Sequence, residues 1–171
     1  LKYYRAFRKQ GMNVDLIDMD CGIEGYQVLV LPMTYMFKQG FAEKVRAFVE
    51  QGGVLITTYW SGIADDTDRC YLGGTPHGLM DVLGLRSTEI DGLFDWEENQ
   101  FMPVDGNELG LFREYTCKYL CDLVRLDGAQ ALMTYGSDFY QGYPALTVNR
   151  YGKGSAWYVA ADAEQVFQED F

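Results

Sequence analysis

A buried strand that runs directly into a glycine-containing loop is the feature that most limits what this chain can fold into. Val54–Tyr59 is apolar and rich in β-branched residues, and it follows an amphipathic helical pattern, Phe41–Glu50, that ends at Gly52-Gly53. In an open α/β sheet, the loop after such a strand is where a nucleophile or phosphate site is built. Here the loop reads Trp60-Ser61-Gly62, with no cysteine, no G-x-S-x-G and no G-x-G-x-x-G motif. The sequence predicts the scaffold of an active site without its usual chemical groups.

The first sixty residues alternate between helical and strand-like patterns. Lys2–Gln10 predicts a helix, and Val14–Ile17 and Tyr26–Leu31 predict strands that precede the helix and strand described above. This rhythm indicates a doubly wound sheet with right-handed crossovers. Because a helix in such folds usually follows a strand, we expect a first strand upstream of Leu1.

The rest of the chain is mostly strand-like and reads as part of the same domain, residues 1–171. A short helix, Leu79–Leu83, precedes the strands, Tyr151–Gly154 predicts a hairpin turn, and Asp162–Phe167 begins a closing helix. The predicted strands are Leu85–Ile90, Tyr119–Leu126, Ala131–Tyr135, Ala145–Asn149 and Ser155–Ala160.

Composition excludes several classes of protein. The net charge of −11 argues against binding to nucleic acid or anionic membranes, which need a basic surface. No apolar run approaches the roughly 18–20 residues of a membrane span. The four cysteines contain no C-x-x-C pair and His77 is the only histidine, so we expect no metal or other cofactor. Free thiols are typical of a reducing compartment, which predicts a cytoplasmic location.

A catalytic triad could be assembled from Ser61, His77 and one of the loop acids Asp65, Asp66 and Asp68. A nucleophilic serine needs a tight strand-to-helix elbow, but Ser61 lacks the glycine two residues before it and a long loop follows it. We therefore favour a loop serine, with an amidotransferase-like enzyme that uses Ser61 as an alternative.

Two further acidic motifs are weak. Asn107-Glu108 matches the dipeptide that carries the general acid in many barrel glycosidases, but it lies in a predicted turn, and a (β/α)₈ barrel needs about 250 residues. The loop acids also lack the glycine and the final glutamate of a calcium-binding EF-hand loop. Neither motif predicts a site.

Several aromatic residues fall in predicted loops: Trp60, Tyr71, Phe139, Tyr140 and Tyr143. Aromatic side chains in loops stack on sugar rings, anchor subunit interfaces or pack over the sheet. A carbohydrate- or small-molecule-binding module is therefore a second alternative.

Segments spread along nearly the whole chain, taken together and in order, resemble the middle domain of family 42 β-galactosidases. The segments that carry the resemblance are Tyr4–Gly11, Val30–Met33, Arg46–Gly53, Ser61–Ile63, Asp68–Gly74, Tyr135–Tyr140 and Pro144–Gly154.

The resemblance implies a flavodoxin-like three-layer α/β sandwich, similar to class I glutamine amidotransferases, with a mostly parallel sheet and a β-rich C-terminal half. In that family the two catalytic glutamates belong to a preceding TIM barrel, so Glu108 inherits no catalytic role. Amidotransferases carry a cysteine after the strand equivalent to Val54–Tyr59 and a histidine late in the domain. This chain has Ser61 and Asp162-Ala163-Glu164 there instead.

The resemblance therefore implies a non-catalytic trimerisation domain of an enzyme that hydrolyses terminal β-galactosides with retention. The implied partners are two further copies of the chain, the TIM barrel of the same polypeptide, and a galactoside at a subunit interface. Trp60, Arg69 and Tyr140 are our candidates for interface or substrate-facing residues, because they lie in loops at or beyond strand ends.

Overall fold

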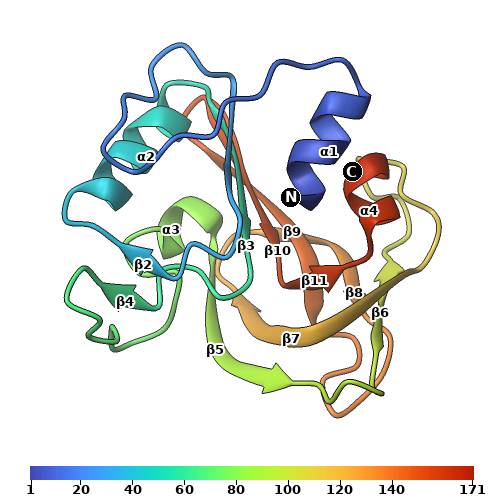
Figure 1. The fold of residues 1–171 in the computed structure, drawn as a ribbon. Coiled ribbons are helices and arrows are strands. Elements are labelled where there is room, and N and C mark those ends of the chain that lie inside the picture. Colours follow the sequence, from blue (N-terminus) through green and yellow to red (C-terminus); the bar gives the residue numbers. More distant parts are fainter.

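The computed structural model describes all residues from Leu1 to Phe171 and contains one nine-stranded sheet with helices on two of its sides (Figure 1). The helices are α1 (Lys2–Lys9), α2 (Phe41–Glu50), α3 (Met80–Leu83) and α4 (Gln165–Asp170). The strands of the large sheet are β1 (Val28–Leu31), β3 (Val54–Thr58), β5 (Leu85–Gly92), β6 (Asn99–Pro103), β7 (Tyr115–Leu126), β8 (Gln130–Tyr135), β9 (Pro144–Tyr151), β10 (Gly154–Val159) and β11 (Ala161–Ala163). Two short strands, β2 (Met36–Phe37) and β4 (Ala64–Asp65), form a separate parallel pair.

The large sheet is mixed, with the order β1-β3-β10-β9-β8-β6-β7-β11 and with β5 paired to β7. Only β1 with β3 and β3 with β10 are parallel, and the remaining pairs are antiparallel. The expectation of a mostly parallel sheet is therefore wrong, whereas the expected β-rich C-terminal half is confirmed. The reason is local: short turns such as Tyr151–Gly154 join neighbouring strands as hairpins, and parallel strands need long crossovers.

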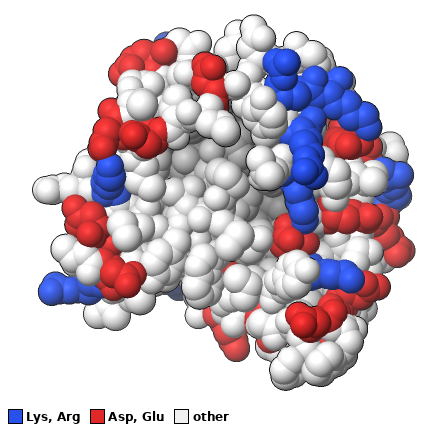
Figure 2. Space-filling model, in the orientation of Figure 1, with Lys and Arg blue, Asp and Glu red and all other residues white.

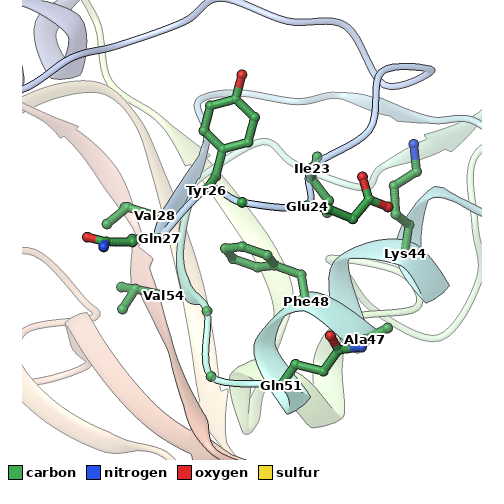
Figure 3. A pocket seen from close by; sticks show the side chains of 13 residues that line it. Ile23, Glu24, Tyr26, Gln27, Val28, Lys44, Ala47, Phe48, Gln51 and Val54 are labelled. Carbon is green, nitrogen blue, oxygen red and sulfur yellow. The ribbon is translucent and has the colours of Figure 1, made fainter.

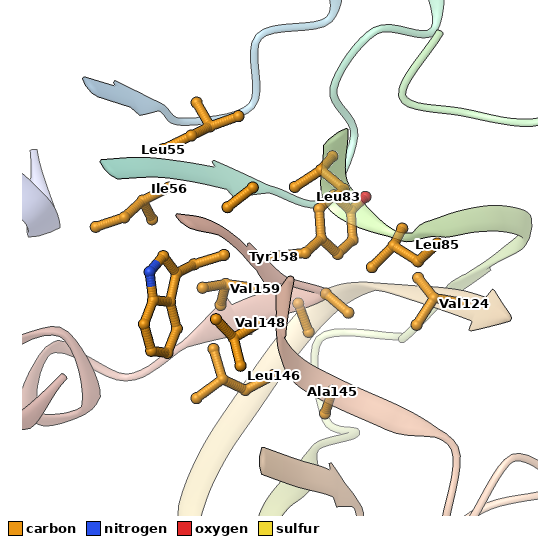
Figure 4. Close-up of a cluster of buried hydrophobic side chains, with 14 of the residues drawn as sticks. Leu55, Ile56, Leu83, Leu85, Val124, Ala145, Leu146, Val148, Tyr158 and Val159 are labelled. Carbon is orange, nitrogen blue, oxygen red and sulfur yellow. The ribbon is translucent and has the colours of Figure 1, made fainter. Parts of the chain in front are cut away.

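Around the parallel strands the fold has three layers. Helices α2 and α3 contact β3, β9 and β10 from one side, whereas α1 packs against α4 on the other side (Figure 1). Successive side chains of β10 point to opposite faces of the sheet and so pack against both helical layers. The ring of Trp157 lies 5.6 Å from that of Phe171, the residue after α4, and the next residue, Tyr158, is fully buried on the side of Leu83 in α3 (Figure 4).

Most predicted elements are present with small shifts in their ends. The helix Phe41–Glu50 has the predicted bounds, and the predicted turn Tyr151–Gly154 joins the antiparallel strands β9 and β10. One prediction is wrong: Val14–Ile17 forms no strand, and Leu16 is 81% exposed. The sequence analysis also missed β6, which pairs with β7 and β8 in the middle of the antiparallel region.

The longest helix, α2, has 10 residues, and none of the four helices could span a membrane.

Candidate functional site

The turn after β3 has the geometry of a tight elbow. Trp60 has φ of 57°, a left-handed conformation that is costly for a residue with a side chain, and Gly62 has φ of 60°. A Cβ atom on Gly62 would lie 2.9 Å from the backbone nitrogen of His77 and 2.9 Å from the ring of Phe37. Only glycine fits at this position, so the elbow is a specified feature of the fold.

The elbow is joined to the loop that follows β1. The Met33 amide donates to Thr58 Oγ1 at 2.8 Å, and the Thr34 amide donates to Ser61 Oγ at 3.0 Å. The Gly62 amide in turn donates to the carbonyl of Thr34 at 2.9 Å. These contacts fix the carboxyl ends of the parallel strands β1 and β3, the place where open α/β sheets bind ligands.

A buried carboxylate from the antiparallel strand β7 binds the backbone of the elbow. Asp122 in β7 is fully buried, and its Oδ2 atom accepts hydrogen bonds from the hydroxyl of Tyr158 at 2.5 Å and from the amide of Trp60 at 3.3 Å. Its Oδ1 atom has no partner. Burial raises the pKa of Asp122 to about 6, and the two donors oppose that rise because they stabilise the charged form. The protonation state of Asp122 is thus linked to the backbone conformation at Trp60.

The accessible surface of the elbow is aromatic. The rings of Trp60 and Tyr35 are stacked with centroids 5.9 Å apart and planes 19° apart, and both side chains are half-buried. The Tyr35 hydroxyl donates to Asp68 at 3.0 Å. Arg69 follows in the same loop, is exposed and makes no ion pair. The site therefore offers a flat ring surface beside a free guanidinium group.

Ser61 and His77 are not arranged as a nucleophile and its base. Ser61 is fully buried and its hydroxyl accepts the hydrogen bond from Thr34, whereas the His77 ring stacks on Tyr71 at 3.7 Å and makes no hydrogen bond. A serine nucleophile must be exposed to its substrate and hydrogen-bonded to its base. The geometry here provides neither.

Asp65 and Glu108, from the two acidic motifs, are bound by other residues of the chain. Asp65 accepts hydrogen bonds from the amide and hydroxyl of Thr67 and from the amide of Arg69, and these contacts, those from Thr67 foremost, lower its pKa. Glu108 pairs with Arg150 through two contacts of 2.8 and 2.9 Å. No three His, Cys, Asp or Glu side chains are grouped where they could share a metal ion.

Tyr140 lies apart from Trp60 and Arg69. Its side chain is fully buried, and its hydroxyl donates to Asp91 Oδ2 at 2.9 Å. Its ring packs edge-on against Tyr135, which in turn donates to the backbone carbonyl of Asp122 at 3.2 Å. Of the three candidates, the structure leaves Trp60 and Arg69 accessible near the elbow and places Tyr140 in the core.

An open groove lies at the opposite, amino ends of β1 and β3 (Figure 3). Tyr26, Phe48 and the first residues of the two strands line it. The ammonium group of Lys44 at its rim donates to the carbonyls of Met19 and Cys21. Glu24 also lines the groove, but no serine, cysteine or histidine does, so the groove provides no basis for nucleophilic catalysis.

The sequence analysis missed Tyr35 and Asp122. An acidic residue inside the apolar run of β7 was the available signal for Asp122, because a carboxylate is rarely buried without a partner. Nothing in the sequence indicated that Tyr35 would stack on Trp60, since the contact depends on how two loops meet.

The entire chain, residues 1–171, matches the family model described as the β-galactosidase trimerisation domain. Two curated relatives are the β-galactosidases BgaP from Planococcus sp., 47% identical over 170 residues, and Pbg from Clostridium perfringens, 45% identical over 170 residues. Each alignment covers 99% of this chain and 25% of the relative. The chain thus spans about a quarter of the length of the curated relatives it matches.

A solved structure agrees with this similarity over the same length. The cold-adapted β-galactosidase from Rahnella sp. R3 superposes with a TM-score of 0.97 at 49% identity, covering 99% of this chain and 25% of that one. An exo-β-1,4-mannosidase from an Opitutaceae bacterium matches with a TM-score of 0.62 at 16% identity, which shows a shared fold alone.

Proposed function

Because this chain belongs to the β-galactosidase trimerisation domain family, we propose that it assembles the subunits of a β-galactosidase and catalyses no reaction itself. The proposal that the chain catalyses no reaction rests on the elbow after β3. It has the tight backbone of a nucleophile turn, yet Trp60 occupies the left-handed position and the neighbouring hydroxyl of Ser61 is buried.

We propose that the parent polypeptide is a homotrimer that hydrolyses terminal β-galactosides with retention, using two glutamates in a TIM barrel outside this chain. The relatives named above support this, since they are β-galactosidases four times as long as the region they share with this chain. The chain would contact its own barrel and two further copies of itself.

The accessible residues of the elbow suggest a role beyond assembly. We propose that Trp60 and Arg69 face a galactoside bound at a subunit interface, where the stacked Trp60 and Tyr35 rings would cover the apolar face of a sugar. Tyr140 would act indirectly, by holding Asp91. In the parent enzyme, Trp60→Ala should raise KM and leave kcat within about twofold. An unchanged KM would remove Trp60 from the substrate surface.

We also propose that the domain contains the flavodoxin-like fold that the family resemblance implies. Strands β1, β3 and β10, covered by helices on both faces, would be the flavodoxin-like unit shared with class I glutamine amidotransferases. The antiparallel strands β5–β9 would be an addition to that unit. The left-handed elbow at Trp60 supports this assignment, since a nucleophile of the related enzymes would stand there.

The free edge of β1 supports the proposal that a further strand of the parent joins the sheet. β1 pairs only with β3, and the segment Val14–Ile17 has no strand partner. An unpaired strand edge readily accepts another strand. Hydrogen exchange of the full-length parent should then show Val28–Leu31 to be as strongly protected as the central strand β3.

We also propose a cytoplasmic location. All four cysteines are free, and two of them, Cys117 and Cys121, are buried. Unpaired thiols of this kind are typical of a reducing compartment.

The experiment that tests the absence of chemistry uses the full-length parent. The double variant Ser61→Ala/His77→Gln should keep kcat/KM for an aryl β-galactoside within about twofold, because neither side chain touches a reacting atom. Light scattering on the same sample checks that assembly is retained. A loss of more than a hundredfold in an intact trimer would overturn the proposal and favour an enzyme that uses Ser61.

A further inference from the structure

The connection between β5 and β6 carries two exposed aromatic rings. We call Asp91–Glu98 the aromatic tip. Phe94 and Trp96 are 63% and 80% exposed, and their rings stack with centroids 4.9 Å apart and planes 8° apart. Aromatic residues are enriched in protein interfaces, and exposed apolar groups that cluster mark binding surfaces. The tip therefore has the composition of a contact site.

The tip is held in place before any partner arrives. The Leu93 amide donates to the carbonyl of Tyr119 at 2.8 Å, and the Phe94 amide donates to Glu97 Oε2 at 2.9 Å. The buried Tyr140 hydroxyl anchors Asp91 at the base of the tip. A preorganised surface loses less entropy on binding, so these contacts favour association.

The charges of the tip are mostly unpaired. It contains four acids, of which Asp95 and Glu97 are exposed and make no ion pair, and Glu98 meets Lys118 at 3.4 Å. A partner for the tip must therefore combine positive charge with a surface that packs on aromatic rings.

The outer face of α1 has these properties. Arg5 and Arg8 are exposed and form no ion pair, and Tyr4 and Met12 beside them are 37% and 50% exposed. Tyr4, Arg5 and Arg8 share one face of the helix, and Met12 follows the helix, with its carbonyl accepting a hydrogen bond from Arg8 at 3.3 Å. We call these four residues the basic stripe. Figure 2 shows Lys and Arg side chains gathered over α1.

Ion pairs hold α1 against the rest of the fold. Lys2 pairs with Asp162 at 2.6 Å, and Lys9 pairs with Glu169 at 2.5 Å. The two lysines are thereby neutralised within the chain, whereas the arginines of the basic stripe stay free for a partner.

We propose that the aromatic tip of one copy docks on the basic stripe of the next copy, so that three chains close into a ring. A cyclic trimer needs an interface made of two different, complementary patches on each chain. In Figure 1, α1 lies near the top and the connection from β5 to β6 at the bottom, so the two patches face different neighbours. A guanidinium group suits this tip because it pairs with carboxylates and stacks on aromatic rings. The inference rests on the proposed homotrimer and names the surfaces that build it.

The test is a charge exchange in the full-length parent, read by light scattering at micromolar concentration. Asp95→Arg reverses a free charge of the tip and leaves Glu97 on the Phe94 amide, and Arg5→Glu/Arg8→Glu reverses the stripe. Each reversal alone should weaken association at least tenfold and give a mass near one chain, because like charges then meet. The combination of all three substitutions should restore the trimer.

Two controls keep folding separate from association. Asp105→Arg/Glu114→Arg reverses two other exposed acids and should leave the trimer intact. Trp96→Ala removes an exposed ring, so the far-ultraviolet spectrum should stay unchanged while association weakens at least tenfold.

The outcomes distinguish this inference from the function on which it rests. A wild-type parent that is monomeric would overturn both. A trimeric wild type whose mass is unaffected by either reversal, or a combined variant that stays monomeric, would overturn the docking of tip on stripe and leave the trimer standing.

Discussion

The parallel and antiparallel halves of the sheet differ in how far helices cover them and in how many aromatic side chains they expose. Around β1, β3 and β10 the sheet is covered by helices on both faces, and strained backbone occurs after β1 at Met33 and after β3 at Trp60. The antiparallel strands β5–β9 instead extend to exposed aromatic residues such as Phe94, Trp96 and Phe139. The parallel half is thus mostly covered by helices, whereas the antiparallel half carries the most exposed aromatic rings.

Asp122 shows that the two halves are nevertheless one unit. It belongs to an antiparallel strand, but its carboxylate accepts a hydrogen bond from the backbone at Trp60 in the parallel half. The comparison teaches that the elbow is maintained by burial and hydrogen bonding from the antiparallel half, without any group that could react. Substitutions that separate the halves should therefore have the largest effects on stability.

The largest effect is expected at Gly154, where the hairpin meets the parallel half. A Cβ atom there would lie 2.2 Å from the carbonyl oxygen of Gly53 and 2.3 Å from that of Val49. Because both are backbone atoms, Gly154→Ala should cost about 3 kcal/mol or more of unfolding free energy. Chemical denaturation measures the loss. Gly92→Ala is the matched control in the antiparallel half, since nothing lies within 4 Å of its Cβ, and a similar loss there would contradict the explanation.

The second effect is a pH dependence from Asp122. Its pKa in the folded chain, about 6, is above the ordinary 3.8, so the folded state holds the proton more tightly. Its contribution to stability is therefore full below pH 4, decreases as the pH rises to about 6 and is constant above that. The decrease amounts to about 3 kcal/mol at most.

Denaturation of Asp122→Asn between pH 4 and 7 checks this sign. The variant should lack the decrease, so its stability relative to the wild type should rise with pH up to about 6. Tyr158→Phe removes a donor that lowers the pKa of Asp122, and the decrease should then extend to higher pH. Parallel curves for wild type and Asp122→Asn would show that Asp122 does not titrate in this range.

A smaller effect compares two arginines. Arg46 joins α2 to α3 by a two-pronged pair with Asp81, and it also donates to Tyr151 Oη and to the carbonyl of Gly78. Arg46→Ala should cost about 1–2 kcal/mol, because a hydrogen-bonded network is lost. Arg150 makes only an exposed pair with Glu108, so Arg150→Ala should cost about 0.5 kcal/mol or less. Equal costs in denaturation would mean that the link between helices adds nothing.

The sequence predicted best where local chemistry decides the structure. The apolar positions of Phe41–Glu50 repeat with helical spacing, and Tyr151–Gly154 contains the glycines of a tight turn, so both were recognisable. Val14–Ile17 has the composition of a strand but no neighbour to pair with, and pairing is what a strand requires. The missed strand Asn99–Pro103 is the reverse case, because its partners β7 and β8 make it a strand.

The sequence indicated which loop is the candidate site, but it did not predict the conformation or the contacts of that loop. The sequence indicated the loop after β3 as the candidate site and Ser61 as a poor nucleophile, and Ser61 is buried in the structure. The left-handed conformation of Trp60, its stacking on Tyr35 and its contact with Asp122 depend on long-range packing that no local pattern encodes. The burial of Tyr140 has the same origin, since loop position alone gave no indication that Asp91 would bind its hydroxyl.

The measurement that tests the central claim most directly is the mass in solution of the parent enzyme with and without this domain. Residues 1–171 would be replaced by a flexible glycine- and serine-rich linker, and both proteins would be measured by light scattering at micromolar concentration. If this domain assembles the enzyme, the intact parent has three times the mass of one chain and the shortened protein has the mass of one. A shortened protein that remains trimeric, with its barrel folded, would contradict the account.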